Sequence, residues 1–212
     1  LDLKNVSHCI NGMRYIKDIT LQLRTNVNTM ILGPNGAGKS LFLRICHGLI
    51  TPSQGEVKFL GPSGAQPKKY QAMVFQKPVM LHRSVIGNME FALKSQKVPK
   101  NRMVSIIEEI LEATGLSRLA KVSARELSTG EQQRLAIGRA WSLKPEILFL
   151  DEPTANLDPA ATHVVEKIIS EIKKSGTTIV MATHDLGQAK RLADNILFLY
   201  RGRVLENSSV ET

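Results

Sequence analysis

A glycine-rich run at residues 33–40 has the spacing of a loop that holds phosphate groups. It follows the short apolar stretch Thr29–Leu32. In such a loop the glycines let successive backbone N–H groups converge on a phosphate, and the following helix N-terminus adds positive potential. Lys39 would neutralise phosphate oxygens, and the Ser40 hydroxyl would bind Mg²⁺. The residues of this predicted nucleotide site are Gly33, Pro34, Asn35, Gly36, Ala37, Gly38, Lys39 and Ser40.

A second acidic centre follows an apolar run later in the chain. Ile147–Leu150 reads as a buried strand, and Asp151 and Glu152 come directly after it. Ligands bind at the carboxyl ends of parallel strands. Asp151 is therefore predicted to hold Mg²⁺ through its water shell, and Glu152 to act as general base on the attacking water. A helix cap is the alternative for the pair taken alone, but the glycine-rich run in the same chain favours catalysis.

Two other polar residues also follow predicted strands. His184 comes after Thr178–Ala182 and Gln76 after Ala72–Phe75, so both would face the same crevice of a parallel sheet. His184 would contact the terminal phosphate or the water, or else be a cap or surface residue. The Gln76 amide would reach Mg²⁺ or water, or else belong to a turn. The spacing leaves both pairs of alternatives open.

Alternating strand and helix patterns predict an α/β fold with a mainly parallel sheet. Helical apolar spacing occurs over Met103–Leu111 and over Val164–Ile172, where Gly176 ends the helix. We predict one domain over residues 1–212, with a core of 1–76 and 127–212 and an inserted helical subdomain at about 77–126. The predicted strands are Asp18–Leu23, Thr29–Leu32, Glu56–Leu60, Ala72–Phe75, Ile147–Leu150, Thr178–Ala182 and Ile196–Tyr200.

Composition narrows the class of protein. The 212 residues are 42% hydrophobic, enough for one core, and neither a leader peptide nor a membrane span is evident. Two cysteines, Cys9 and Cys46, suit a reducing cytoplasm, and both are expected to be buried or half-buried. The net charge of +9 invites a nucleic-acid or anionic-membrane partner. However, the densest basic stretch, residues 94–102, lacks interleaved aromatics, which favours a solvated loop over acidic lipid, and acidic lipid over nucleic acid.

Residues 127–134, Leu-Ser-Thr-Gly-Glu-Gln-Gln-Arg, complete a resemblance to the ABC family of nucleotide-binding domains. The chain resembles this family from end to end, with its motifs in their usual order. The resemblance implies a P-loop NTPase fold of ABC type, with an N-terminal antiparallel β subdomain beside the parallel sheet. It also implies ATP hydrolysis with Mg²⁺. Its implied site residues are Ser128, Thr129, Gly130 and Glu131 of the signature, Gln76 of the Q-loop, Asp151 and Glu152, Asp158 of the D-loop, and the switch histidine His184.

The resemblance further implies how such a subunit works with partners. Two copies would face head to tail, so that the signature of one closes over ATP bound to the P-loop of the other. Transmembrane permease subunits and an extracytoplasmic solute-binding protein would complete the assembly, with this subunit cytoplasmic and peripheral on the inner face of the membrane. Apolar residues at 78–81 and 91–93 would either contact the permease or pack in the core.

The sequence departs from the family pattern at the signature and at the adenine contact. Thr129 stands where the family usually has Gly, and Glu131 stands where it usually has Gln. The added negative charge would weaken closure unless Glu131 points away from the nucleotide. The family's adenine-stacking aromatic aligns with Ile10, so Tyr15 or apolar contact alone would take its place.

Motifs at 81–88, 143–146, 155–158 and 184–194 are most similar to those of tungstate importer ATPases, with phosphate and molybdate importers next. An ABC ATPase that acts on nucleic acid or ribosomes is the competing class, as is an ABC subunit for another transport substrate. The nucleic-acid class usually carries inserted coiled coils, zinc sites or a second cassette, none of which is visible. The signature also argues against a simple P-loop kinase or GTPase. No nucleic-acid partner is expected.

Overall fold

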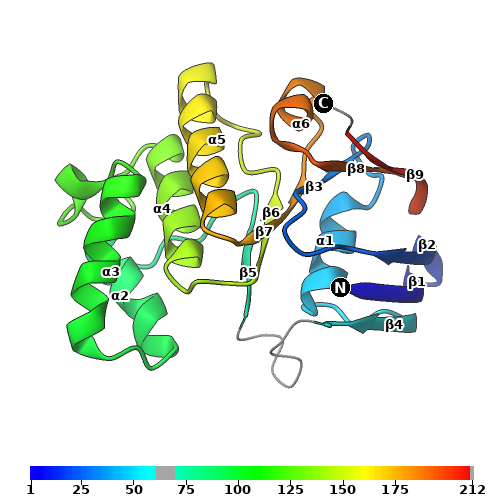
Figure 1. Ribbon diagram of the computed structural model, residues 1–212, viewed down its shortest axis with the longest axis horizontal. Helices are drawn as coiled ribbons and strands as arrows, with labels where there is room; N and C mark the ends of the chain where they lie inside the picture. Colours follow the sequence, from blue (N-terminus) through cyan, green and yellow to red (C-terminus); the bar gives the residue numbers. More distant parts are fainter. Residues whose placement is uncertain (61–69, 211–212) are drawn as a thin grey trace.

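The computed structural model describes residues 1–60 and 70–210, and its central element is a six-stranded sheet (Figure 1). The strand order is β5-β6-β7-β3-β8-β9. The first five strands in this order are parallel, and the edge strand β9 pairs antiparallel with β8. The strands are β3 (Thr29–Leu32), β5 (Gln71–Val74), β6 (Ile147–Asp151), β7 (Thr178–Ala182), β8 (Asn195–Tyr200) and β9 (Arg203–Ser209).

A second, three-stranded sheet is antiparallel and lies at the opposite side of the molecule from the helical region (Figure 1). Its order is β2-β1-β4, formed by β1 (Asp2–Ile10), β2 (Met13–Gln22) and β4 (Gln54–Lys58). Asn11 and Gly12, both with positive φ, make the two-residue turn between β1 and β2.

Helices cover both faces of the central sheet. The apolar face of α1 (Lys39–His47) packs between the two sheets, whereas α4 (Thr129–Trp141), α5 (Pro159–Lys174) and α6 (Leu186–Leu192) pack on the other face. The buried strand β6 serves both layers, since alternate side chains point to opposite faces. Ile147 and Phe149 join the α1 side, and Leu148 and Leu150 join the other.

A separate helical cluster lies beyond the β5 edge of the central sheet (Figure 1). It contains α2 (Val85–Ser95), α3 (Lys100–Ala113) and the short 3₁₀ helix η2 (Ser117–Leu119), packed around a core of their own. Leu135 of α4 also enters this core, so α4 connects the helical cluster to the sheet. The mainly parallel sheet, the antiparallel sheet and the group of helices predicted from the sequence are confirmed.

Two strands were absent from the sequence prediction. β1 is irregular, with register shifts along its pairing with β2, so its apolar residues do not keep a period of two. β9 is a mostly exposed edge strand whose sequence is largely polar. Predicted bounds also shifted by one or two residues at β4 and β5, and β2 begins at Met13 rather than at Asp18.

The two cysteines differ in environment. Cys46 is buried, and burial raises the pKa of its thiol far above the ordinary value. Cys9 is exposed on β1, so the expectation that both thiols are at least half-buried is wrong for Cys9. Within residues 1–60 and 70–210, no helix combines the length and apolar character needed to cross a membrane.

Candidate active site

The glycine-rich run forms a tight loop between β3 and α1. Gly33 has φ +152°, and a side chain there would collide with the backbone carbonyl of Leu199 on β8. Gly38 has φ +103° at the position that begins α1. Only glycine adopts both conformations without strain. The loop therefore presents its backbone at the N-terminus of α1, the end of a helix that attracts anions.

Lys39 is almost fully buried, and the loop itself surrounds its ammonium group. Nζ donates hydrogen bonds to the Gly33 carbonyl oxygen at 2.8 Å and to the Pro34 carbonyl oxygen at 3.3 Å. It also lies 3.2 Å from Oε1 of Glu152. The positive charge is thus held inside the loop, at the place predicted for a phosphate.

Ser40 and Asp151 meet next to Lys39. The Ser40 hydroxyl donates to Oδ1 of Asp151 at 2.8 Å, although the two residues are 111 apart in sequence. Asp151 is 3% exposed. Burial raises the pKa of its carboxyl group, and the hydrogen bond from Ser40 partly opposes that shift.

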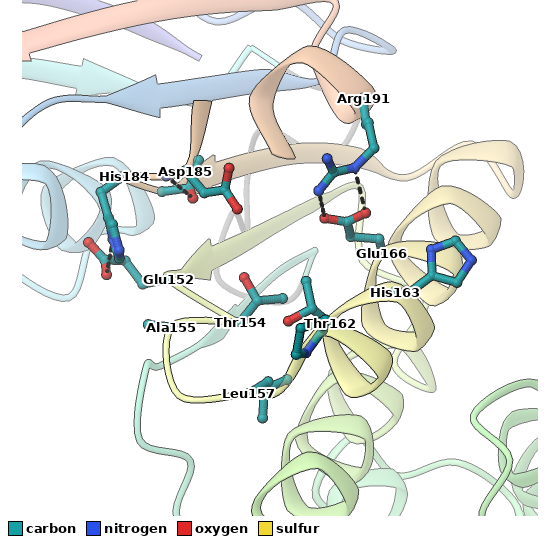
Figure 2. Close-up of a pocket in the computed structure, with 12 residues that line it drawn as sticks. Glu152, Thr154, Ala155, Leu157, Thr162, His163, Glu166, His184, Asp185 and Arg191 are labelled. Carbon is teal, nitrogen blue, oxygen red and sulfur yellow. Dashed lines mark hydrogen bonds and ion pairs between the residues drawn. The ribbon is translucent and has the colours of Figure 1, made fainter. Parts of the chain in front are cut away.

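Glu152 lies between Lys39 and His184. Its Oε2 is 3.0 Å from Nδ1 of His184, and its backbone N–H donates to the Ala182 carbonyl oxygen at 3.0 Å. Figure 2 shows the His184 ring directed at this carboxylate. Glu152 has φ +46°, a left-handed backbone conformation that is unfavourable for a residue with a side chain. Such strain persists only where surrounding contacts hold it, and it is common at functional sites.

Six of the eight predicted nucleotide residues, those at 35–40, share one open cavity of ≈ 710 Å³ with Glu152 and His184. Gln76, two residues beyond the end of β5, lines this cavity. So do Ile10 and Tyr15, which are 43% and 42% exposed. The structure thus brings together residues 35–40, Glu152, His184, Gln76 and the two candidate adenine contacts.

The signature residues lie elsewhere, around a second cavity of ≈ 410 Å³ at the start of α4. It is lined by Ser128, Thr129, Gly130 and Glu131 together with Asn156 and Asp158. Asn156 lines both cavities. Asp158 caps α5 by accepting a hydrogen bond from the Ala161 N–H at 2.8 Å.

Glu131 turns back onto Ser128. Its Oε2 accepts hydrogen bonds from both the backbone N–H and the hydroxyl of Ser128, each at 2.8 Å, in a capping box at the start of α4. Hydrogen bonds from the Ser128 side chain and backbone lower the pKa of the Glu131 carboxyl group. The added negative charge is thus held at Ser128 rather than directed away from it.

Comparison with known proteins identifies the family. The family model described as ABC transporter matches residues 16–155. The chain belongs to the ABC transporter family. The chain is therefore an ABC-type ATPase.

Curated ABC relatives match along nearly the whole chain. A tungstate uptake system ATP-binding protein, TupC, from Peptoclostridium acidaminophilum is 38% identical over 97% of each chain. A phosphate import ATP-binding protein, PstB, from Mycoplasmoides gallisepticum is 38% identical over 100% of this chain and 70% of its own length. An arginine transport ATP-binding protein, ArtP, from Haemophilus influenzae is 34% identical over 99% and 92%.

Solved ABC structures share the fold. A dimeric ATP-binding cassette in a post-hydrolysis state, bound to ADP and Pi, has a TM-score of 0.87 at 26% identity and covers 100% of this chain and 99% of its own. An ATP-binding subunit of an ABC transporter has a TM-score of 0.88 at 25% identity, covering 99% and 89%.

The donor set of this ABC ATPase fits a magnesium ion. The Ser40 hydroxyl and the Asp151 carboxylate meet beside the glycine-rich loop, and Gln76 lines the same cavity as Ser40. In residues 1–60 and 70–210 there is no group of three or more His, Cys, Asp or Glu side chains that could hold a metal by itself. Mg²⁺ binds through one or two protein oxygens together with phosphates and water, so this sparse set suits it.

Three further residues near Glu152 and His184 were not predicted as site residues. The half-buried Thr154 and the buried Glu166 and Gln188 form a hydrogen-bonded polar cluster. Thr154 lies two residues after Glu152, and Gln188 lies four residues after His184. This proximity to predicted site residues was the available signal. The signal for Glu166 was weaker: it is a charged residue within the apolar pattern of α5.

Proposed function

We propose that this chain is the ATP-hydrolysing subunit of an ABC importer for tungstate or a related oxyanion. The observation that supports ATP hydrolysis most directly is the position of Glu152, which lies within hydrogen-bonding distance of both Lys39 and His184 beside the glycine-rich loop. One ammonium, one carboxylate and one imidazole meet where a terminal phosphate would lie, an arrangement suited to hydrolysis of a phosphoanhydride.

In the proposed reaction, the oxygen of a water molecule forms a bond to the γ-phosphorus as the bond to the bridging oxygen of ADP breaks. Glu152 accepts the proton from this water, and Lys39 neutralises charge on the phosphate oxygens. His184 holds the Glu152 carboxylate and contacts the terminal phosphate. Ser40, Asp151 and Gln76 would hold Mg²⁺, which would supply further positive charge at the phosphate oxygens.

The proposed active unit is a head-to-tail homodimer. Ser128 and Gly130 line the signature cavity but not the nucleotide cavity of the same chain, although Asn156 lines both, so in this proposal a second copy brings its Ser128 and Gly130 to ATP. The start of α4 presents N–H groups suited to a γ-phosphate. A solved cassette that shares this fold is a dimer bound to ADP and Pi, which supports a dimeric active unit. ATP would close the dimer, and hydrolysis would reopen it.

An apolar groove of ≈ 450 Å³ is the proposed contact for the permease. Val79 is 69% exposed and Phe91 is 47% exposed at this groove, and Phe75 contributes from the end of β5. Leu93 is instead fully buried in the helical core. Core packing therefore applies to Leu93, whereas the exposed Val79 and Phe91 are available to contact a permease. The groove begins beside Gln76, which places it next to the nucleotide cavity.

The substrate class rests on the relatives. TupC matches along 97% of both chains, and a molybdate/tungstate import ATP-binding protein, WtpC, from Pyrococcus horikoshii is 34% identical over 92% of this chain and 58% of its own length. Phosphate is a tetrahedral oxyanion as well, so the PstB relatives fit the same class. ArtP marks the alternative, an importer of another substrate.

The decisive experiment reconstitutes this chain in proteoliposomes with permease subunits of an oxyanion importer or of an arginine importer. ATP hydrolysis is measured with the matching binding protein and tungstate, molybdate, phosphate or arginine. We expect tungstate to stimulate hydrolysis above the rate with arginine. Stimulation by arginine alone would show that the transported substrate is not an oxyanion. Stimulation by added RNA, with no response to any solute, would instead favour the nucleic-acid class of ABC ATPase.

A further inference from the structure

One fully buried glutamine connects the loops that carry the proposed catalytic residues. Gln188 of α6 is 0% exposed. Its Nε2 donates to Oγ1 of Thr154 at 3.0 Å and to Oε1 of Glu166 at 3.1 Å. The Thr154 hydroxyl in turn lies 3.3 Å from Oε1 of Gln188. Both ends of the Gln188 amide are therefore used.

The partners of Gln188 come from three different segments. Thr154 follows Glu152 by two residues, in the loop after β6. Glu166 belongs to α5, the helix that Asp158 caps. Gln188 itself lies in the first turn of α6, where Asp185, the residue after His184, caps the helix by accepting from the Gln188 backbone N–H at 3.0 Å. A single residue thus fastens the loops of Glu152 and His184 to α5.

Glu166, which accepts from Gln188, is itself held in place by an ion pair. It is 5% exposed, and Arg191 binds it through two hydrogen bonds, Nε to Oε2 at 2.9 Å and Nη2 to Oε1 at 2.6 Å (Figure 2). Burial raises the pKa of Glu166, but the bonds from Arg191 and Gln188 outweigh it, so the net shift is downward. An ionised Glu166 makes its bond from Gln188 charge-assisted, which fixes the orientation of the amide.

Apolar packing alone does not hold these loops. A cavity of ≈ 580 Å³ opens beside them, lined by Glu152, Thr154 and His184 on one side and by Glu166 and Arg191 on the other (Figure 2). Side chains that border open space lack neighbours to restrain them. Specific hydrogen bonds must then keep Glu152 in its strained backbone conformation and His184 directed at its carboxylate.

We propose that Gln188 is a positioning residue for ATP hydrolysis: because it lies in the first turn of α6, which follows His184, its side-chain bonds to Thr154 and Glu166 set the relative placement of Glu152 and His184. This inference rests on the proposed function, in which Glu152 activates the water. Lys39 and Ser40 are held by the glycine-rich loop and by Asp151, and a small displacement of Glu152 leaves its charge beside Lys39. Loss of the cluster should therefore lower kcat and leave the binding of ATP nearly unchanged.

The test compares Thr154→Val, which removes the hydroxyl at constant shape, with Thr154→Ser, which keeps it. Gln188→Met and the Thr154→Val/Gln188→Met double variant complete a cycle. We expect about a tenfold or larger loss of kcat in Thr154→Val and in Gln188→Met, because small displacements of reacting groups cost that much. Thr154→Ser should stay close to the parent, and KM for ATP should change little in all four variants.

Non-additivity is the second readout. If Thr154 and Gln188 act as one unit, the double variant loses no more activity than the worse single variant. Thr114→Val serves as a matched control, because Thr114 is 1% exposed and its hydroxyl donates to the Ile110 carbonyl oxygen at 2.7 Å in α3, away from the site. That variant should lose thermal stability and keep its kcat.

The proposal is overturned if kcat of Thr154→Val equals that of the parent, if Thr154→Ser fails to restore kcat, or if the losses in the cycle are additive. Gln188→Met could fail to fold, but the Thr154 pair still decides the matter. Glu152→Gln, assayed in parallel, separates this outcome from failure of the proposed function. An active Glu152→Gln variant would remove the catalytic assignment, whereas an inactive one beside a fully active Thr154→Val removes only the positioning role.

Discussion

The ammonium of Lys39 lies 3.2 Å from the carboxylate of Glu152, and both side chains are largely buried at 5% and 13% exposure. The charge proposed to receive the phosphate is thus already paired with the proposed general base. An incoming γ-phosphate must compete with Glu152 for Lys39. The proposed function therefore gives Glu152 an influence on nucleotide binding as well as on hydrolysis.

Glu152→Gln should separate these two roles. The amide keeps the size of the side chain but loses both its negative charge and its ability to accept a proton. We expect ATP to bind at least as tightly, the ATP-bound dimer to persist, and kcat to fall about a hundredfold or more. Equilibrium nucleotide binding, size-exclusion chromatography with ATP and steady-state hydrolysis measure the three effects.

Glu108→Gln is the matched control, because Glu108 is exposed on α3 and far along the chain from the site. It should behave as the parent in all three assays. Unimpaired turnover in Glu152→Gln would exclude Glu152 as the general base.

Glu131→Gln should strengthen dimer closure. The Glu131 carboxylate now accepts from the Ser128 hydroxyl, so its charge would lie beside the γ-phosphate that Ser128 is proposed to meet. Glutamine preserves an acceptor for the capping box and removes the charge. We expect half-maximal dimerisation at about two- to fivefold lower ATP, the scale of one exposed charge interaction. Light scattering during an ATP titration measures it.

Ser128→Arg supplies the opposite change, since a bulky side chain should block closure while ATP binding to the monomer is retained. Glu112→Gln, on exposed α3 surface, controls for the loss of one charge. Equal ATP requirements in the parent and Glu131→Gln would show that the carboxylate does not oppose closure. Normal dimerisation of Ser128→Arg would contradict the in-trans arrangement itself.

The sequence predicted those parts of the site that local chemistry dictates. The glycines at 33 and 38 and the apolar run into Asp151 each need a particular residue at a particular backbone position, so pattern alone located them. The folding of Glu131 onto Ser128 depends on side-chain rotamers at a helix start. The Gln188 cluster joins residues 22 and 34 apart. Such contacts between distant segments leave no periodic trace in the sequence. The strand β1 was not predicted for a related reason, because irregularities interrupt the alternation of its apolar and polar residues.

Glu166→Gln should reduce stability in a pH-dependent way. Because the folded state lowers the pKa of Glu166, its ionised form stabilises the protein above the unfolded pKa of about 4.3, and this contribution is lost as pH falls through the lower folded pKa. We expect the free energy of unfolding of the variant to be about 1–3 kcal/mol below that of the parent at pH 7, the usual cost of weakening a buried charged hydrogen bond. This difference should become smaller below about pH 4. Urea unfolding at pH 7 and pH 3 measures it.

Glu171→Gln controls for an ordinary charge on the same helix. Glu171 pairs with Lys174 at 2.8 Å, but its side chain is 58% exposed, so the expected effect is below about 1 kcal/mol at either pH. Equal deficits for Glu166→Gln and Glu171→Gln at pH 7 would deny Glu166 a structural role. A deficit that grows in acid would reverse the assigned sign of its pKa shift.

Tyr15→Ala should weaken nucleotide binding through the base. Tyr15 and Ile10 both line the nucleotide cavity and are roughly half exposed, so an adenine ring laid against them would cover apolar surface. An aromatic contact contributes about 0.5–1.5 kcal/mol beyond area burial, which corresponds to about a two- to tenfold rise in Kd for ATP. Tyr15→Phe keeps the ring and should bind as the parent does. Ile10→Ala tests the apolar alternative: if it raises Kd while Tyr15→Ala does not, the base is held by Ile10 without stacking.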